Sequence, residues 1–196
     1  MNRALAASLS LVAAIALAGC DGKSDAAQSS GPPSSTPSVA ATTTPSATPS
    51  ASPTLRPPTP PAAALGGLTV TAAESFARFY FQTLDYLTVT GDAASARRWA
   101  DKSCIACKTL IGHYEAIYKA GGSVTGDAAS QVVQVSQVRL IRHDTAAVLL
   151  KVREGKTVER TKRGGAPTTY PAGTLTWDLT LAAAGSHWTM FEMETK

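Results

Sequence analysis

The first 75 residues of this 196-residue sequence contain no aromatic side chain; all twelve Phe, Tyr and Trp residues lie from Phe76 onward. Aromatic side chains supply much of the buried area of a core, so this first stretch lacks the means to build one. Removing residues 1–66 leaves 130 residues, enough for one domain of ordinary size. The length therefore excludes a two-domain enzyme, a solenoid and a polytopic membrane protein.

The sequence also has little excess of positive over negative charge, and few histidines. From residue 67 on there are 15 Lys and Arg against 12 Asp and Glu, an excess too mild for a dedicated nucleic-acid-binding domain. The three histidines show no metal-ligand spacing. No serine or cysteine has a recognisable base partner. We therefore expect no nucleic-acid partner, no metal, no cofactor and no catalytic residue.

The N-terminal apolar run is too short for a membrane-spanning helix. It covers residues 4–18 after Arg3, which is typical of a secretory signal peptide. It ends in Leu17-Ala18-Gly19-Cys20, which resembles the lipobox of bacterial lipoproteins. The resemblance implies that residues 1–19 are a lipoprotein signal peptide and that Cys20 carries lipid, including palmitate. An uncleaved membrane helix is the alternative interpretation.

A lipidated Cys20 would hold the protein in the cell membrane, at its extracytoplasmic face, because two acyl chains anchor stably where one does not. It would also leave Cys104 and Cys107 as an even pair in a compartment that permits disulfides. Residues 21–66 hold 10 Pro, 16 Ser or Thr and 9 Ala, a composition that cannot form a core. We predict that residues 20–66 are a lipid-anchored, disordered tether.

A single domain is predicted at residues 67–196, and it opens with helix signals. Thr71 and Glu74 match a capping box. An apolar stripe at helical spacing then continues to Gly91 and consists of Phe76, Tyr80, Leu84 and Leu87. Asp92 and Ser103 are the predicted caps of two further helices.

After Gly126 the period of the apolar residues changes to two. A register change near Ser136 suggests a β-bulge. The predicted inward faces of two strands are Ala146, Val148, Leu150 and Val152, and Leu175, Trp177, Leu179 and Leu181. This order predicts an α+β fold, with two or three N-terminal helices packed on a curved antiparallel sheet of four or five strands.

The pair Cys104 and Cys107 is the most distinctive local motif. At the first turn of a helix this spacing brings the α-carbons close enough for a disulfide, which would be structural. A catalytic dithiol at a helix N-terminus is the second interpretation. A zinc site is the third, although two more ligands would be needed.

Several tyrosines and acids are candidates for lining a pocket. Tyr80, Tyr114 and Tyr118 fall on apolar stripes, so the alternative is that they belong to the core with hydroxyls that reach water. Asp85 and Asp178 lie off the apolar faces of their elements, and we expect both to be solvated. Tyr86 completes this candidate set.

The segment 151–163 carries six basic and two acidic residues and is followed by Gly164-Gly165. It is either a solvated hairpin tip or a surface for anionic head groups or wall polymers.

Three motifs occur in order in the predicted domain. They are the aromatic run 76–81 with Thr90-Gly91-Asp92, the Ser103-Cys104-x-x-Cys107 helix, and Tyr118-x-x-Gly121-Gly122. Together they resemble a family of uncharacterised actinobacterial lipoproteins, defined as a domain of unknown function. More distantly, the predicted fold resembles the nuclear-transport-factor-2-like cone. Neither resemblance implies an activity.

Tethering, a cysteine pair suited to a disulfide and the lack of a convergent polar constellation favour a non-catalytic binding or adaptor module. Its expected partners are the membrane, through the N-terminal lipid, and an envelope protein or anionic polymer. The alternative is a small pocket enzyme of isomerase or cyclase type. A thiol oxidoreductase using Cys104 and Cys107 is the third.

Overall fold

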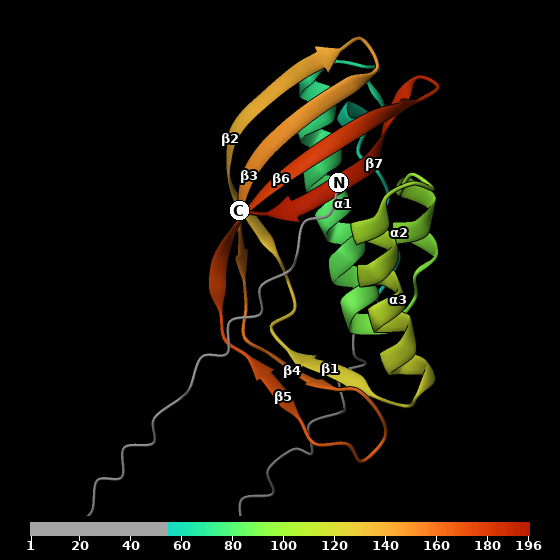
Figure 1. Ribbon diagram of the computed structural model, residues 1–196, viewed down its shortest axis with the longest axis vertical. Helices are drawn as coiled ribbons and strands as arrows, with labels where there is room; N and C mark the ends of the chain where they lie inside the picture. Colours follow the sequence, from blue (N-terminus) through green and yellow to red (C-terminus); the bar gives the residue numbers. More distant parts are fainter. Residues whose placement is uncertain (1–54) are drawn as a thin grey trace, which may run out of the picture. The chain divides into compact units, whose positions relative to one another are not determined.

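The computed structural model describes residues 55–196, which form three α-helices, a short 3₁₀ helix and seven strands (Figure 1). The predicted signal peptide, Cys20 and the tether up to residue 54 lie outside the described residues. Among residues 55–196 no helix combines the length and apolar character needed to cross a membrane. The helices are η1 (Ala62–Leu65), α1 (Val70–Thr90), α2 (Ala94–Trp99) and α3 (Ile105–Lys119).

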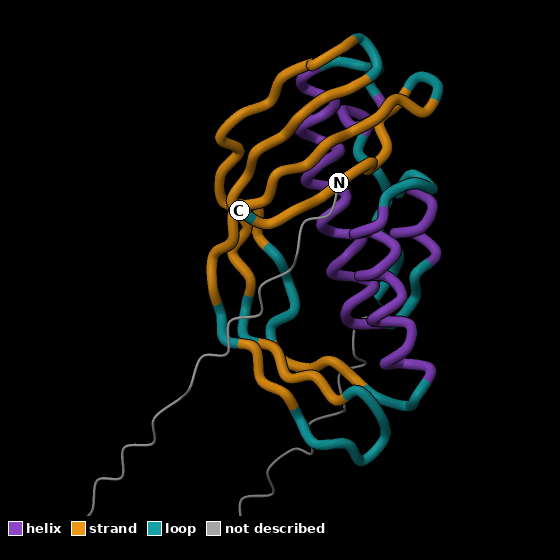
Figure 2. Tube along the Cα trace, viewed as in Figure 1, coloured by secondary structure: helices purple, strands orange, loops and turns teal. Residues whose placement is uncertain are grey.

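The strands form two antiparallel sheets, and the helices pack against the concave side of the larger one (Figures 1 and 2). The larger sheet has four strands in the order β2-β3-β6-β7, which confirms the predicted α+β fold; a sheet of three short strands, β1-β4-β5, comes in addition. The strands are β1 (Ser123–Gly126), β2 (Gln131–Arg142), β3 (Thr145–Glu154), β4 (Thr157–Arg160), β5 (Thr168–Tyr170), β6 (Gly173–Ala184) and β7 (His187–Thr195).

Helix α1 begins and ends where its backbone groups find partners. The Oγ1 atom of Thr69 accepts a hydrogen bond from the amide of Ala72 at 3.1 Å, which satisfies one of the free donors of the first turn. The capping box predicted at Thr71 and Glu74 is therefore wrong by two residues, and Glu74 instead pairs with Arg78 at 2.9 Å. At the other end Gly91 adopts φ 74°, in the left-handed region that ends many helices.

The other two predicted caps need a smaller correction. Asp92 accepts a hydrogen bond from the amide of Ala94 at 3.0 Å, but the residue at the N-cap position of α2 is Ala93. At α3 the N-cap is Cys104 rather than Ser103, and its sulfur accepts from the amide of Cys107 at 3.2 Å. Moving an N-cap by one residue hardly alters the apolar pattern of the helix, so a helix boundary predicted from sequence is easily wrong by one residue.

The core lies between α1 and the larger sheet. Phe76, Phe79 and Leu87 of α1 are at most 1% exposed. The predicted inward face of β3 is confirmed, with all four residues fully buried. On β6 Leu179 and Leu181 are fully buried, whereas Leu175, near the other end of the strand, is 39% exposed. The contiguous burial identifies one core.

The packed chain begins before residue 67. Ala64 in η1 is fully buried within the same core. The indole nitrogen of Trp188, on the last strand, donates to the backbone oxygen of Thr69 at 3.2 Å. Composition alone hides this start, because a short run of Ala after Pro reads as part of the tether.

The two edges of the larger sheet differ. At β7 the loop after α2 covers the edge, where Ala100 forms a parallel bridge with Met190 and the amide of Asp101 donates to the Met190 oxygen at 2.7 Å. At β2 the edge is free of a partner strand among the described residues, and its register with β3 shifts at three places. One shift falls between Val135 and Gln137, where the sequence predicts a bulge.

Candidate functional site

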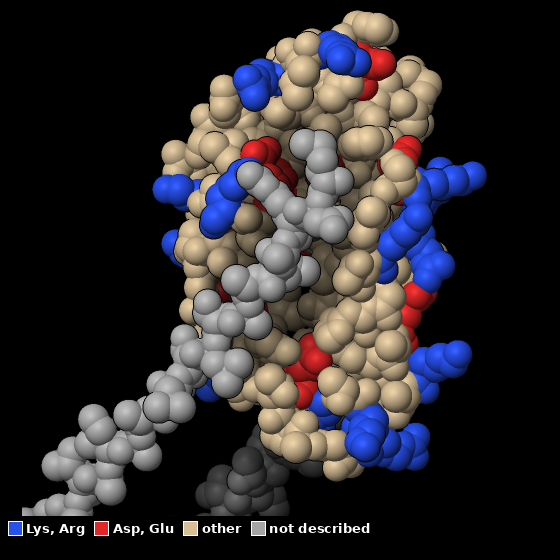
Figure 3. All heavy atoms as spheres, in the orientation of Figure 1, with Lys and Arg blue, Asp and Glu red and all other residues tan. Residues whose placement is uncertain are grey.

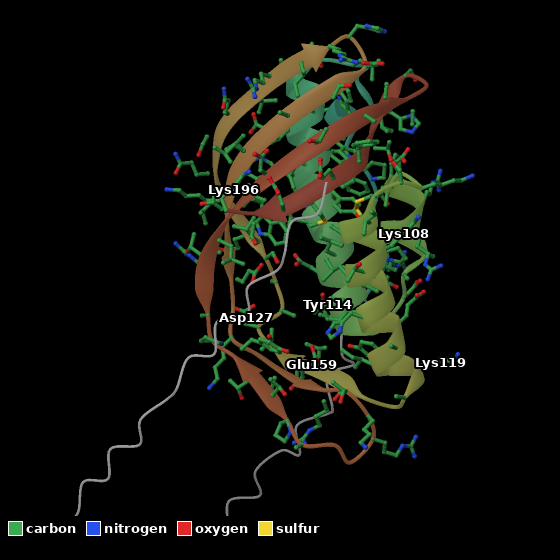
Figure 4. All side chains as sticks on the ribbon, in the orientation of Figure 1. Lys108, Tyr114, Lys119, Asp127, Glu159 and Lys196 are labelled. Carbon is green, nitrogen blue, oxygen red and sulfur yellow. A yellow bond between two sulfur atoms is a disulfide. The ribbon has the colours of Figure 1, made fainter. Side chains whose placement is uncertain are left out.

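A cavity of about 110 Å³ lies where α1 and α3 face the ends of the strands. Six segments supply its lining, and most lining groups are polar. Figure 4 shows Tyr114, Asp127 and Glu159 around the space between α3 and the strands. The lining consists of Asp85, Thr88, Tyr114, Asp127, Ala128, Ser130, Glu154, Gly155, Thr157, Tyr170 and Pro171.

Glycine at residue 155 allows Asp127 to reach this site. A Cβ at Gly155 would lie 2.2 Å from the Asp127 backbone oxygen and 2.6 Å from its Cγ, so any side chain there would displace the loop. The amide of Asp127 donates to the backbone oxygen of Lys156 at 3.0 Å, which fastens the β1–β2 loop to the β3–β4 turn. Gly126, at φ 100°, makes the turn into this loop.

Asp85 is the most perturbed carboxyl of the cavity. Burial raises its pKa from 3.8 to about 6, hydrogen bonds from the side chain and backbone of Ser130 oppose the rise, and the negative charges of Glu154 and Asp127 add to it. Asp85 is half-buried, so it is less solvated than the sequence predicts. Asp85 follows Leu84 at the edge of the apolar stripe of α1 and lies one helical turn from the buried Phe81 and from the buried Thr88.

Two further titratable groups share this environment. Burial raises the pKa of Glu154. Burial also raises the pKa of Tyr114, a hydrogen bond with the Thr88 side chain opposes this, and the charge of Glu159 adds to it. The cavity thus collects carboxyl and hydroxyl groups that are partly withdrawn from water, a common property of functional sites.

The three tyrosines proposed as pocket residues have different surroundings. Tyr114 lines the cavity. Tyr80 is fully buried in the core, its ring stacks on Phe76 at 6.2 Å, and its hydroxyl has no hydrogen-bond partner among the described residues. Tyr118 donates its hydroxyl to the backbone oxygens of Thr88 and Val89 at 2.8 and 2.7 Å, so it ties α3 to the end of α1.

The remaining members of the candidate set lie elsewhere. Asp178 faces outward on β6 and pairs with Lys196 at 3.3 Å. The hydroxyl of Tyr86 donates to Asp92 at 3.4 Å. Neither residue lines the cavity.

A histidine–carboxylate contact next to the cavity has no counterpart in the sequence reasoning. Glu159 on β4 is 6% exposed, and its Oε2 lies 3.0 Å from Nε2 of His113, which is more exposed. The rings of His113 and Tyr114 are 5.2 Å apart. Strand alternation on β4, with Glu159 pointing inward opposite Val124, was the only signal, and four residues are too few to detect it.

Strand alternation also sorts the charges of residues 151–163. Lys151, Arg153 and Arg160 are exposed, whereas Glu154 is partly buried at the cavity and Glu159 is buried. Figure 3 shows acidic side chains both near the middle and at the edges of this face, and basic ones mostly along its edges.

Cys104 and Cys107 form a disulfide, with α-carbons 5.3 Å apart. Cys104 is 1% exposed and Cys107 is fully buried. The bridge therefore closes the first turn of α3 inside the core. Within residues 55–196 there is no group of three or more His, Cys, Asp or Glu side chains arranged to hold a metal ion.

Comparison with known proteins places the chain in a family without assigning it an activity. A family model described as "Family of unknown function (DUF6318)" matches residues 45–194. No curated protein matches the chain.

The solved structures that are similar to the chain include three of low sequence identity. The intermembrane-space region of the chloroplast protein ARC6 is 12% identical, covers 65% of this chain and 95% of its own, and has a TM-score of 0.49. A substituted form of Rd1NTF2_05 is 13% identical, covers 63% of this chain and 99% of its own, and has a TM-score of 0.36. A putative calcium/calmodulin dependent protein kinase II association domain from Xanthomonas campestris is 10% identical, covers 59% and 80%, and has a TM-score of 0.34. The likeness concerns the fold alone.

Proposed function

The chain belongs to the DUF6318 family, and we propose that it is a lipid-anchored protein of the cell envelope whose domain is a non-catalytic binding module. The cavity between α1, α3 and the strands is its binding site. The observation that carries this proposal is the convergence of Asp85, Asp127 and Glu154 on one small space. The anchor rests on the sequence around Cys20.

The size of the cavity limits what enters it. A water molecule occupies about 30 Å³ of liquid volume, so a space of about 110 Å³ holds a group of only a few heavy atoms. Pockets for whole small molecules are usually about 300–1,000 Å³. The cavity therefore suits one donor-bearing group, such as an amine or guanidinium, presented by a larger partner.

The surroundings of the cavity suit a protein partner. Asp85 also lines a neighbouring hollow of about 290 Å³, together with Leu55 and Val89. These two side chains are 57% and 41% exposed, and Tyr170 of the cavity is 47% exposed. Exposed apolar side chains next to polar groups are typical of interaction sites, whose apolar part is rimmed by polar residues.

In-cell crosslinking of the full-length tethered protein, read by mass spectrometry, tests this function. We expect one envelope protein to be enriched over a control in which the same anchor and tether carry an unrelated domain. The double variant Asp85→Asn, Glu154→Gln should reduce this enrichment about ten-fold, because two partly buried acceptors lose their charge.

The matched control is Asp178→Asn with Glu192→Gln, which makes the same charge change on the outward face of β6 and β7. Equal losses in both double variants, or no enriched protein in the wild type, would contradict the proposal.

A small pocket enzyme is the second candidate, because Asp85 with a pKa near 6 shares the cavity with the Tyr114 hydroxyl. A carboxylate base beside a hydrogen-bond donor is what proton abstraction next to a carbonyl needs. Such an enzyme should retain a small molecule when it is purified gently. Native mass spectra that show only the empty protein would count against it.

A thiol oxidoreductase is a weaker candidate. Thiol exchange requires an accessible sulfur, and both cysteines are almost completely buried. Reduction of insulin by the protein would support a thiol oxidoreductase.

A further inference from the structure

The outward side of α3 forms an exposed, positively charged surface away from the cavity. Ile105, Lys108, Gly112, Ala116 and Lys119 are all exposed, and their spacings of three, four and seven residues place them on one side of the helix. We call these five residues the outer face of α3. Figure 4 shows Lys108 and Lys119 on this side, while Tyr114 points toward the strands.

Two cations from the preceding segment extend this face. Arg97 and Lys102 line a hollow of about 380 Å³ together with Lys108, and its other lining residues are Ala100, Asp101 and Ile111. Arg97 pairs with Glu115. Lys102 and Lys108 form no ion pair within residues 55–196. The carboxylate of Asp101 lies near both and offsets part of their charge, so the two lysines leave a net positive charge for a partner.

Positive charge continues at the other end of the helix. The amide of Arg163 donates to the backbone oxygen of Ala120 at 3.1 Å, and its side chain lies beside Gly121. Basic side chains therefore follow the whole length of α3, which is 15 residues, or about 22 Å. Figure 3 shows them along the edge formed by α2 and α3.

The exposed side chain of Ile105 indicates which kind of anionic partner fits this surface. It is 78% exposed, more than any other large apolar side chain among the described residues, and it lies between Lys102 and Lys108 in the sequence. A linear polyanion offers partners to the lysines but no apolar environment for the isoleucine. The interface of a bilayer offers both, because head groups lie beside the upper acyl chains.

We infer that the outer face of α3 docks on an anionic lipid bilayer, with Ile105 at the interface and Lys102 and Lys108 among the head groups. Only 34 residues separate Cys20 from Leu55, so the lipid proposed on Cys20 would keep the domain at a high effective concentration near that surface; this step rests on the proposed anchor. The docking surface shares no residue with the cavity lining, so its test is independent of the role proposed for the cavity.

Flotation with lipid vesicles tests the inference. The protein is the chain from residue 20 to 196 with Cys20→Ser, so that no acyl chain holds it on the vesicle. We expect binding to vesicles with about one third phosphatidylglycerol, weakening steeply between about 50 and 500 mM salt, and none to pure phosphatidylcholine. The pair Lys102→Gln, Lys108→Gln should weaken binding about 25-fold, or about five-fold for each cation.

Two further variants make the result specific. Ile105→Ser should weaken binding about ten-fold at unchanged charge, since it removes the apolar contact. The matched control Lys151→Gln, Arg153→Gln removes two cations from the opposite side of the larger sheet and should leave binding within about two-fold. Thermal unfolding confirms that each variant is folded.

Equal weakening in both charge variants would overturn the docking surface, because it would show that only net charge matters. Binding that Ile105→Ser leaves intact would overturn the bilayer as the partner. Binding to a soluble polyanion such as polyphosphate, without binding to vesicles, would overturn it in favour of a wall polymer.

Discussion

Replacing Asp85 by Asn should stabilise the domain at neutral and alkaline pH. In the folded protein the pKa of Asp85 is about 6, against 3.8 for the ordinary value. About 1.4 kcal/mol corresponds to each pH unit of that difference, which gives at most about 3 kcal/mol for holding the ionised carboxyl in the cavity. Because Asp85 is only partly withdrawn from water, we expect about half of this, about 1.5 kcal/mol.

The sign follows from the direction of the change. A raised folded pKa means that the wild type loses stability as pH rises from about 4 through 6, when the buried carboxyl ionises. Asn carries no proton to lose and keeps a carbonyl oxygen for Ser130. The variant should therefore match the wild type near pH 4 and exceed it at pH 8.

Thermal unfolding followed by circular dichroism at both pH values measures this difference. For a domain of this size, about 1.5 kcal/mol corresponds to an increase in Tm of about 5 °C at pH 8. Asp178→Asn is the control, because it removes the outward pair with Lys196 and should give no increase at either pH. If Asp85→Asn changed Tm equally at pH 4 and pH 8, or lowered it at pH 8, the assignment of a buried ionised carboxyl would be refuted.

Three further predictions concern the packing of the helices. The double variant Cys104→Ser, Cys107→Ser should lose about 2 kcal/mol of stability, as expected for a closed loop of four residues, and an unchanged urea midpoint would contradict a stabilising bridge. Gly91→Ala should cost more than about 2 kcal/mol, because φ is 74° and the new Cβ would lie 2.4 Å from Cγ of Tyr118; a cost below about 0.5 kcal/mol in the same urea titration would show that the contact is not tight. Thr69→Ala should cost about 1 kcal/mol through loss of the N-cap, whereas Thr71→Ala, at the position that the sequence suggested, should cost less, and the reverse order in thermal unfolding would restore the predicted capping box.

The sequence predicts the parts of this fold that depend on local periodicity. The apolar stripe on α1 continues for three turns, and the alternation on β3 continues for four inward residues. Both patterns are long enough to stand out from chance. The pairing of Cys104 with Cys107 is predicted from their spacing and from the even pair that a lipidated Cys20 would leave, although the spacing also permits a catalytic dithiol or a zinc site. The short strands β1, β4 and β5 have three or four residues each, too few for a pattern.

The cavity is harder to predict because its members are distant in the sequence. Glu154 continues the phase of Val148, Leu150 and Val152, so the alternation already places it on the inner side of the sheet. The sequence does not show that the β1–β2 loop brings Asp127 next to Glu154, because this proximity depends on close packing of the loop against Gly155. Tyr118 fits an apolar stripe equally well whether it lines a pocket or ties two helices together.

The unequal edges of the larger sheet affect how crowded copies of the protein coexist. A lipid anchor would confine many copies to one surface, where a flat, open strand edge invites pairing between neighbours. The loop after α2 occupies the β7 edge. The three register shifts along β2 bend the other edge, and Arg139 and Arg142 place charge on it, although Leu140 and Ile141 are exposed there. On a membrane-anchored protein, the irregular and charged β2 edge would hinder the addition of strand to strand between neighbouring copies.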